Sequence, residues 1–200
     1  MQSAVFDIET TDLGAVGAGI VLCVCIRPTQ TQRTRTFQLD MWEYDPDPLF
    51  GFLEREETDL LKAVHTELAK YHILVGHHID GFDLPYLKSR AFRLGIEWRI
   101  NPFTYDTLKA FRRTHFLTRQ NGFGKPSAGL DMVADFAGVK QEKTKIYPAD
   151  WWESIWGNKQ TRSEAIHKIV LHCQKDVRLN ANILEVLWAA DMRATIRRAL

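Results

Sequence analysis

Two carboxylates stand two residues apart near the start of this chain, in a run that otherwise has the character of a buried strand. The run is Ala4–Thr11, and its acids are Asp7 and Glu9. Because side chains alternate across a strand, both acids point to the same face. Neighbouring carboxylates repel each other and are costly to bury unless a cation compensates them, and hard divalent cations bind through oxygen ligands. The segment predicts a cation site; the alternative is an edge strand with a solvated acidic face.

The composition is that of an ordinary globular protein. The 200 residues are 45% hydrophobic and 26% charged, which suits one domain spanning residues 1–200. No run is long and apolar enough for a membrane helix, and the N-terminus enters the first strand without a signal peptide, so we expect an intracellular, cytoplasmic protein with no membrane partner. Cys23, Cys25 and Cys173 are interpreted as small buried hydrophobes, with a redox or zinc role as the alternative.

The order of the expected elements predicts an α/β fold. Apolar runs and turn residues indicate strands at 4–9, about 19–26, about 33–39, 73–77 and 98–103. Helical periodicity indicates helices at 56–71, 84–94 and 130–137, a basic helix after Asp106, and a last helix opened by a capping box at Thr161 and Glu164. Residues 119–129 are expected to form a loop. Three strands followed by alternating helices and strands predict a mixed β-sheet flanked by helices.

A third acid stands where a strand ends and a helix begins. Asp83 follows the turn after Val75-Gly76 and precedes the helix that starts near Leu84. An acid at this place also has a plain structural role, because it can cap free amides and complement the helix dipole. Both interpretations stay open from the residues alone.

A fourth acid and a histidine share one face of the final helix. His172 and Asp176 are four residues apart, and Cys173 and Val177 lie beside them on the apolar stripe. The pair should therefore sit at the edge of the core, where an unpartnered aspartate is disfavoured. The alternative is a surface His–Asp pair.

These three segments, in this order, resemble the three motifs of the DEDD superfamily of 3′→5′ exonucleases, which have a ribonuclease H-like fold. Residues 6–10 (FDIET) resemble the first motif. Residues 82–87 (FDLPYL) resemble the second motif in the style of family-B DNA polymerase proofreading domains. His172 and Asp176 occupy the third, although the family has Tyr-x3-Asp or His-x4-Asp there. His78 also stands where the second motif usually has Asn.

The resemblance implies a two-metal nuclease. Asp7, Glu9, Asp83 and Asp176 would hold two Mg²⁺ or Mn²⁺ ions, which activate a water and stabilise the leaving 3′-oxygen. His172 would orient or deprotonate that water. The resemblance also suggests four substrate-binding or supporting residues, which are Thr10, Leu13, His78 and Asn180. The expected substrate is the 3′ end of single-stranded DNA or RNA, with DNA slightly favoured.

The second half of the chain is basic, and the first half is acidic. Such a division suits a phosphodiester substrate that needs cations at one site and phosphate contacts at another. Candidate phosphate contacts, or alternatively solvated positions, are Lys109, Arg112, Arg113, Arg119, Lys125, Lys140, Lys143 and Lys145. The aromatic segment Ile146–Trp156 favours a small satellite core over the last helix, with stacking on unpaired bases as the alternative.

Two other functions remain open from the sequence. One is a nucleic-acid-binding module that keeps the fold without catalysis, although all four metal-ligand acids are present. The other is a structure-specific or endonucleolytic nuclease of the same fold. Metal-dependent cleavage of labelled strands separates the first from an exonuclease, and the product ladder separates the second.

Overall fold

A mixed five-stranded sheet forms the centre of the molecule. The computed structural model describes residues 1–16, 19–31, 33–39, 51–113, 128–141 and 144–199, with only the backbone at 51, 52, 113 and 191–199. The strands stand in the order β3-β2-β1-β4-β5. The first three form an antiparallel meander, and β4 and β5 run parallel to β1. Their bounds are β1 Ser3–Thr10, β2 Val21–Pro28, β3 Arg35–Gln38, β4 Ile73–Gly76 and β5 Phe103–Asp106.

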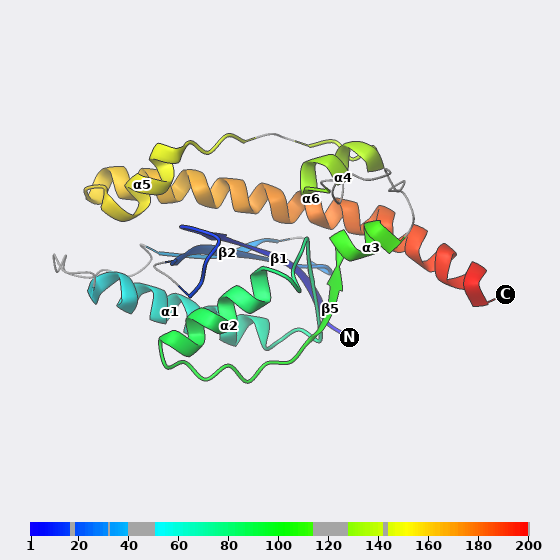
Figure 1. Ribbon diagram of the computed structural model, residues 1–200, viewed down its shortest axis with the longest axis horizontal. Coiled ribbons are helices and arrows are strands. Elements are labelled where there is room, and N and C mark those ends of the chain that lie inside the picture. The colour runs from blue at the N-terminus through cyan, green and yellow to red at the C-terminus, as the bar shows by residue number, and fades with distance from the viewer. Residues whose placement is uncertain (17–18, 32, 40–50, 114–127, 142–143, 200) are drawn as a thin grey trace, which may run out of the picture.

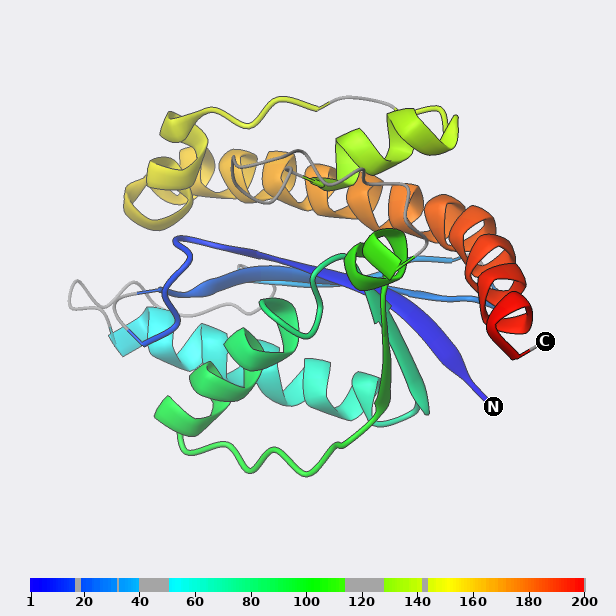
Figure 2. The ribbon, with the colours of Figure 1, turned by 45° about the vertical axis from the view of Figure 1, so that its right-hand side comes forward.

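Helices cover both faces of this sheet (Figure 1). Helices α1 and α2 lie on one face, and the long α6 crosses the other face with α4 and α5 on its outer side (Figure 2). Between α4 and α5, residues 139–141 and 144–147 run as extended chain along α6. The helix bounds are α1 Gly51–Leu68, α2 Asp83–Arg93, α3 Thr107–Arg113, α4 Leu130–Ala137, α5 Pro148–Trp156 and α6 Lys159–Ala199. The predicted α/β architecture, a mixed sheet flanked by helices, is confirmed.

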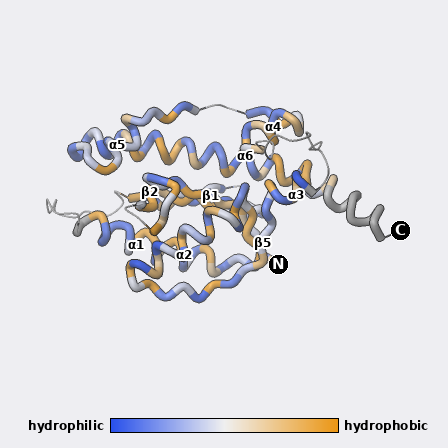
Figure 3. The backbone as a smooth tube through the Cα atoms, in the orientation of Figure 1, coloured by the Kyte–Doolittle hydropathy of each residue, from blue (hydrophilic) through white to orange (hydrophobic). Residues whose placement is uncertain are grey.

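The core follows from the position of β2 between two helical layers. All six residues from Val21 to Ile26 are fully buried, because a strand covered on both faces needs apolar side chains on both. Figure 3 shows this apolar character in the central strands, whereas polar residues recur along the outer helices. Cys23, Cys25 and Cys173 are buried in the same core, as expected of small hydrophobes. Within the described residues, no helix combines the length and apolar composition needed to cross a bilayer.

Several boundaries differ from those predicted, most clearly at the fifth strand, the first helix and the last helix. The fifth strand is Phe103–Asp106 and not 98–103. Residues 103–106 are the ones that pair in parallel with Ile73–Gly76 of β4. Helix α1 begins at Gly51 instead of Glu56. Helix α6 begins at Lys159, before the predicted capping box at Thr161: the Asn158 side chain accepts hydrogen bonds from the amides of Gln160 and Thr161, both at 3.0 Å.

The expected end of α4 is confirmed at Gly138. This residue has φ of +68°, a left-handed conformation that closes the helix and that glycine adopts without a steric penalty. The loop predicted at 119–129 lies almost wholly outside the described residues, with only Ala128 and Gly129 inside them.

Candidate active site

Strand β1 presents Asp7 and Glu9 on one face of the sheet. The antiparallel register sets Asp7 opposite Cys25 and Glu9 opposite Cys23, so the two acids alternate with the buried Phe6 and Ile8. The register shifts between Glu9 and Thr10, which ends the regular pairing directly after the second acid. The face that carries the acids lies against α6, since Cys173 Sγ donates a hydrogen bond to the Asp7 carbonyl oxygen at 3.4 Å.

Helix α2 contributes Asp83 from its first position. The side chain is buried, and its carboxylate accepts hydrogen bonds from the backbone of Asp83 itself and of Ile8. The first of these satisfies an amide at the start of α2, so the capping role and a place beside the acids of β1 coexist at Asp83. The Asp83 carboxylate acts electrostatically on Asp7 and Glu9, so the turn between β4 and α2 brings it to the acids of β1.

Helix α6 completes the group from the opposite side. His172 Nε2 lies 3.6 Å from Asp176 Oδ2 and 3.9 Å from Glu9 Oε1. Ligand atoms of Glu9, His172 and Asp176 all fall within 4.8 Å of one another, and the same holds for Asp7, Glu9 and Cys173. The His172 and Asp176 side chains are each 28% exposed, as expected for a pair at the edge of the core. The structure thus gathers Asp7, Glu9, Asp83, His172 and Asp176 from three elements.

Burial raises the pKa of each of the four acids, and repulsion by the other acids of the cluster raises the pKa of Asp7 and Glu9 further. Desolvation raises the pKa of Asp7 well above its ordinary range, and Asp83, Glu9 and Asp176 raise it further. Burial, followed by the charge of Asp176, raises the pKa of Glu9 to about 8. Burial raises the pKa of Asp83 to about 7, against hydrogen bonds from the backbone of Asp83 and Ile8, and it also raises the pKa of Asp176. Such a cluster favours bound cations at neutral pH.

The imidazole of His172 is oriented from outside the acid cluster. Thr144 Oγ1, in the segment between α4 and α5, lies 2.7 Å from His172 Nδ1. This hydrogen bond directs the other ring nitrogen, Nε2, toward Glu9 and Asp176. Nothing in the sequence pointed to Thr144, because the two residues are 28 positions apart and belong to no common motif.

Two of the sequence-predicted residues are engaged elsewhere. Asn180, expected to face the site, is buried and its Oδ1 accepts a hydrogen bond from Thr107 Oγ1 at 2.9 Å. Its contact therefore joins α6 to α3. His78 is exposed in the turn before α2 with φ of +70°, and its ring occupies the space that a Cβ on Gly81 would need. Its backbone amide donates to Asp106.

The two remaining predicted residues lie at the end of β1 and in the loop after it. Thr10 Oγ1 donates a hydrogen bond to the Asp12 carbonyl oxygen at 2.6 Å, which shapes the β1–β2 loop. Leu13 is 86% exposed in that loop, and Val16 beside it is 88% exposed. An exposed apolar loop next to the acid cluster is compatible with a contact to a substrate base or sugar.

Asp106 is another buried acid near Asp83 that the sequence interpretation did not single out. Its Oδ1 accepts hydrogen bonds from the backbone amides of His78, Leu108 and Lys109 at 3.1, 3.0 and 3.2 Å. It therefore caps α3 and holds the turn that precedes Asp83, whose pKa its charge also raises. Its position between a strand and a helix, typical of an N-cap aspartate, was the available signal.

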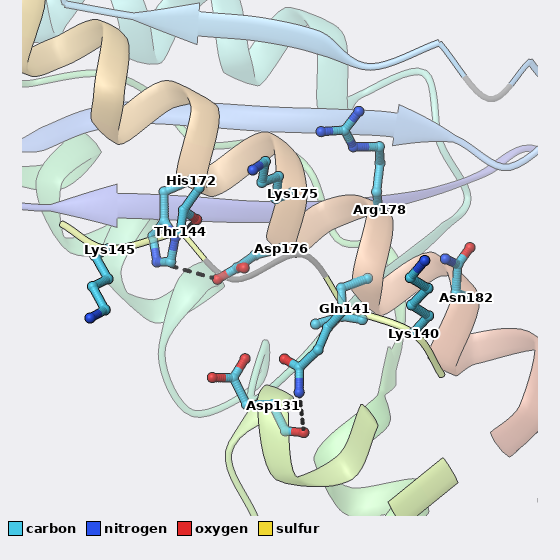
Figure 4. Close-up of a pocket in the computed structure, with 11 residues that line it drawn as sticks. Asp131, Lys140, Gln141, Thr144, Lys145, His172, Lys175, Asp176, Arg178 and Asn182 are labelled. Carbon is cyan, nitrogen blue, oxygen red and sulfur yellow. Dashed lines mark hydrogen bonds and ion pairs between the residues drawn. The ribbon is translucent and has the colours of Figure 1, made fainter. Parts of the chain in front are cut away.

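A basic pocket adjoins the acid cluster (Figure 4). Its volume is about 300 Å³, and its lining includes His172 and Asp176 together with four cationic side chains, Lys140, Lys145, Lys175 and Arg178. Asp131 of α4 also lines it and raises the pKa of Asp176. Of the other predicted phosphate contacts, Lys109 pairs with Asp80 at 2.6 Å. Arg119, Lys125 and Lys143 lie outside the described residues, and only the backbone of Arg113 lies inside them.

The donor set fits hard divalent cations. Four carboxylates with raised pKa values offer the oxygen ligands that Mg²⁺ and Mn²⁺ take, and two dications would balance their charge. His172 and Cys173 add a nitrogen and a sulfur at the margin of the cluster. These softer atoms are poorer ligands for Mg²⁺ than the carboxylates are.

Comparisons with known proteins agree with this architecture. A family model described as the RNase H superfamily matches residues 4–188. The fold is similar to that of a family B DNA polymerase from the hyperthermophilic archaeon Pyrobaculum calidifontis, with a TM-score of 0.56 and 17% identity. That match covers 92% of this chain and 24% of the polymerase, so the chain spans about a quarter of that protein's length. No curated protein sequence matches the chain.

Proposed function

Because this chain belongs to the RNase H superfamily, we propose that it is a metal-dependent 3′→5′ exonuclease that hydrolyses single-stranded nucleic acid. The observation that supports this most is the convergence of Asp7, Glu9, Asp83 and Asp176, in which the charges of Asp83 and Asp176 raise the pKa values of Asp7 and Glu9. An acid cluster of this kind destabilises the folded chain unless it serves to bind cations. Nucleases of this superfamily use divalent metals.

The four carboxylates would hold two Mg²⁺ or Mn²⁺ ions, which supply an activated water and charge stabilisation for the leaving 3′-oxygen. Asp7 and Glu9 reach the site from the sheet, Asp83 from α2 and Asp176 from α6, so the site closes only when all three layers are packed. His172 Nε2 faces the same space and would accept the proton of the attacking water. Thr144 keeps the imidazole in that orientation. The cations of the adjoining pocket would hold phosphates of the strand.

The test is cleavage of matched 5′-labelled single strands of DNA and RNA in the presence of Mg²⁺ or Mn²⁺. A 3′→5′ exonuclease shortens the label-bearing strand one nucleotide at a time into a ladder. Asp176→Asn should abolish the ladder, and Glu185→Gln, an exposed acid on the same helix, should leave it unchanged. Immediate release of short labelled fragments would indicate internal cutting instead. Binding without any metal-dependent cleavage would indicate a catalytically silent module.

A further inference from the structure

Helix α5 exposes two large aromatic side chains next to each other. Trp152 is 66% exposed and Trp156 is 53% exposed, and their ring centroids lie 5.7 Å apart at an interplanar angle of 35°. The neighbouring Trp151 and Ile155 pack against the main core, so among the described residues this segment does not form the separate satellite core that was expected. Paired, solvent-facing indoles are a costly surface feature for a folded chain and indicate a contact with a partner.

The position of α5 relative to the acid cluster follows from its contacts with α6. Lys168 Nζ pairs with Asp150 Oδ1 at 2.7 Å, and Arg162 Nε donates to the Ser154 carbonyl oxygen at 3.2 Å. Lys168 precedes His172 by one helical turn, and Arg162 precedes it by nearly three. At 1.5 Å per residue these contacts place α5 roughly 6 to 15 Å from His172 along the axis of α6. A few nucleotides of single strand span this distance.

The chain between the acid cluster and the two indoles is itself part of the candidate site. Thr144 contacts His172, Lys145 follows it directly and is exposed, and Tyr147 at the start of α5 is 61% exposed. Lys140 and Lys145 both line the basic pocket beside Asp176. The nearest acid at the start of α5, Asp150, is neutralised by Lys168. Cations followed by exposed aromatic rings suit phosphates and unpaired bases of one strand.

We propose that Trp152 and Trp156 form a stacking platform for unpaired bases, several nucleotides upstream of the 3′ end that lies at the acid cluster. This inference rests on the proposed function and extends it, because it assigns a second contact region and a minimum length to the substrate. Stacking uses the π-face that every base has, so the platform binds single strands without preference for sequence. A duplex, in which the bases are already stacked on one another, does not use it.

The experiment measures binding without turnover. Oligothymidylates of 3, 6 and 12 nucleotides with a 5′-fluorescein are titrated with protein in EDTA, and the dissociation constants are read from fluorescence anisotropy. Trp152→Ala, Trp156→Ala and the double variant are compared with Trp188→Ala. Trp188 is the matched control, because it is 51% exposed and packs against Tyr105 farther along α6, on the C-terminal side of His172.

Each platform variant removes an indole on which a base stacks, and stacking contributes about 1–3 kcal/mol per base. The variants should therefore bind the 12-mer roughly 5- to 100-fold more weakly than the wild type does. The trinucleotide, too short to reach α5, should change by less than about twofold. A 12-mer whose upstream positions are abasic should bind the wild type as weakly as the intact 12-mer binds the double variant. Equal losses in Trp188→Ala, losses independent of length, or unchanged 12-mer affinity would each overturn the platform. Unchanged affinity would assign the indoles to a protein partner.

The outcome separates the two proposals. If the wild type cleaves no strand but the length-dependent loss is observed, the proposed hydrolysis fails and the platform stands. If strands are degraded from the 3′ end and the platform variants bind every length like the wild type, the platform alone fails.

Discussion

Thr144 and His172 are joined by a side-chain hydrogen bond of 2.7 Å that links the α4–α5 segment to the acid cluster. The bond occupies Nδ1 of the imidazole and leaves Nε2 facing Glu9 and Asp176. A residue outside every motif thus controls the direction of the one nitrogen base in the site. This arrangement gives the first prediction.

Thr144→Val should lower kcat by about 5-fold while KM changes little, because a lost hydrogen bond of about 1 kcal/mol frees the imidazole to rotate away from the water. Thr144→Ser retains the hydroxyl and should recover most of the rate. Steady-state hydrolysis of a short oligonucleotide measures both constants. Thr66→Val, which removes a hydroxyl bonded only to the Lys62 carbonyl of α1, is the control and should match the wild type. If Thr144→Ser and Thr144→Val have the same kcat, the hydroxyl does not position His172.

A second prediction follows from the raised pKa values of the acids. The pKa of Glu9 is raised to about 8 and that of Asp83 to about 7, whereas in the unfolded chain both lie near 4. The folded protein therefore binds more protons, so this contribution to stability is complete below about pH 4 and is lost as the pH rises through 7 to 8. In EDTA the melting temperature should fall between pH 5.5 and pH 9.

Metal should counteract that fall. Because Mn²⁺ binds the deprotonated carboxylates, its stabilisation of the folded protein should be larger at pH 8 than at pH 6. Asp83→Asn removes one of the repelling charges, so in EDTA at pH 8 it should be more stable than the wild type, by roughly 1–3 kcal/mol. Thermal unfolding followed by circular dichroism measures these differences. A metal-free melting temperature that is insensitive to the Asp83 substitution would contradict the clustering of charge.

Asp106 carries a third prediction, this one on stability. Its carboxylate is buried and accepts four backbone amides from the β4–α2 turn and the start of α3. Asp106→Ala leaves these amides without their acceptor and should lower the free energy of unfolding by about 2–4 kcal/mol. Asp135→Ala, at an exposed acid of α4, should cost less than about 1 kcal/mol. Urea unfolding measures both; equal effects would mean that Asp106 does not hold the turn.

The parts of the site that the sequence could predict are those set by local periodicity. Alternation along β1 placed Asp7 and Glu9 on one face, and helical spacing paired His172 with Asp176, and both relationships are present. Contacts between segments that are distant in the sequence leave no periodic pattern from which they could be predicted. The bond from Thr107 to Asn180 joins residues 73 positions apart, and it turns Asn180 toward α3 although its helical position favoured the acid-bearing side.

Several predicted boundaries of helices and strands were wrong for a related reason. The capping box at Thr161 and Glu164 is a valid local pattern, but Asn158 supplies the cap three residues earlier and the helix extends to meet it. The aromatic segment shows the same limit: its composition could not tell which rings face the core. Packing against the core partly buries Trp151 and Ile155, while Trp152 and Trp156 remain exposed.

The last prediction concerns His172, whose Nε2 faces Glu9 and Asp176. His172→Ala removes the proposed proton acceptor and should lower kcat by roughly 10²- to 10⁴-fold. Mn²⁺ affinity, measured by calorimetry, should change far less, because the four carboxylates remain. His172→Tyr should recover part of the lost rate, since a hydroxyl at this point can still hydrogen-bond the attacking water. His167→Ala, one turn and a residue earlier on α6 and exposed, is the control and should leave kcat unchanged. Turnover in His172→Ala equal to that of the wild type would remove the imidazole from the mechanism. A large loss of Mn²⁺ affinity would instead make His172 a ligand, with Glu9 and Asp176 as its nearest partners.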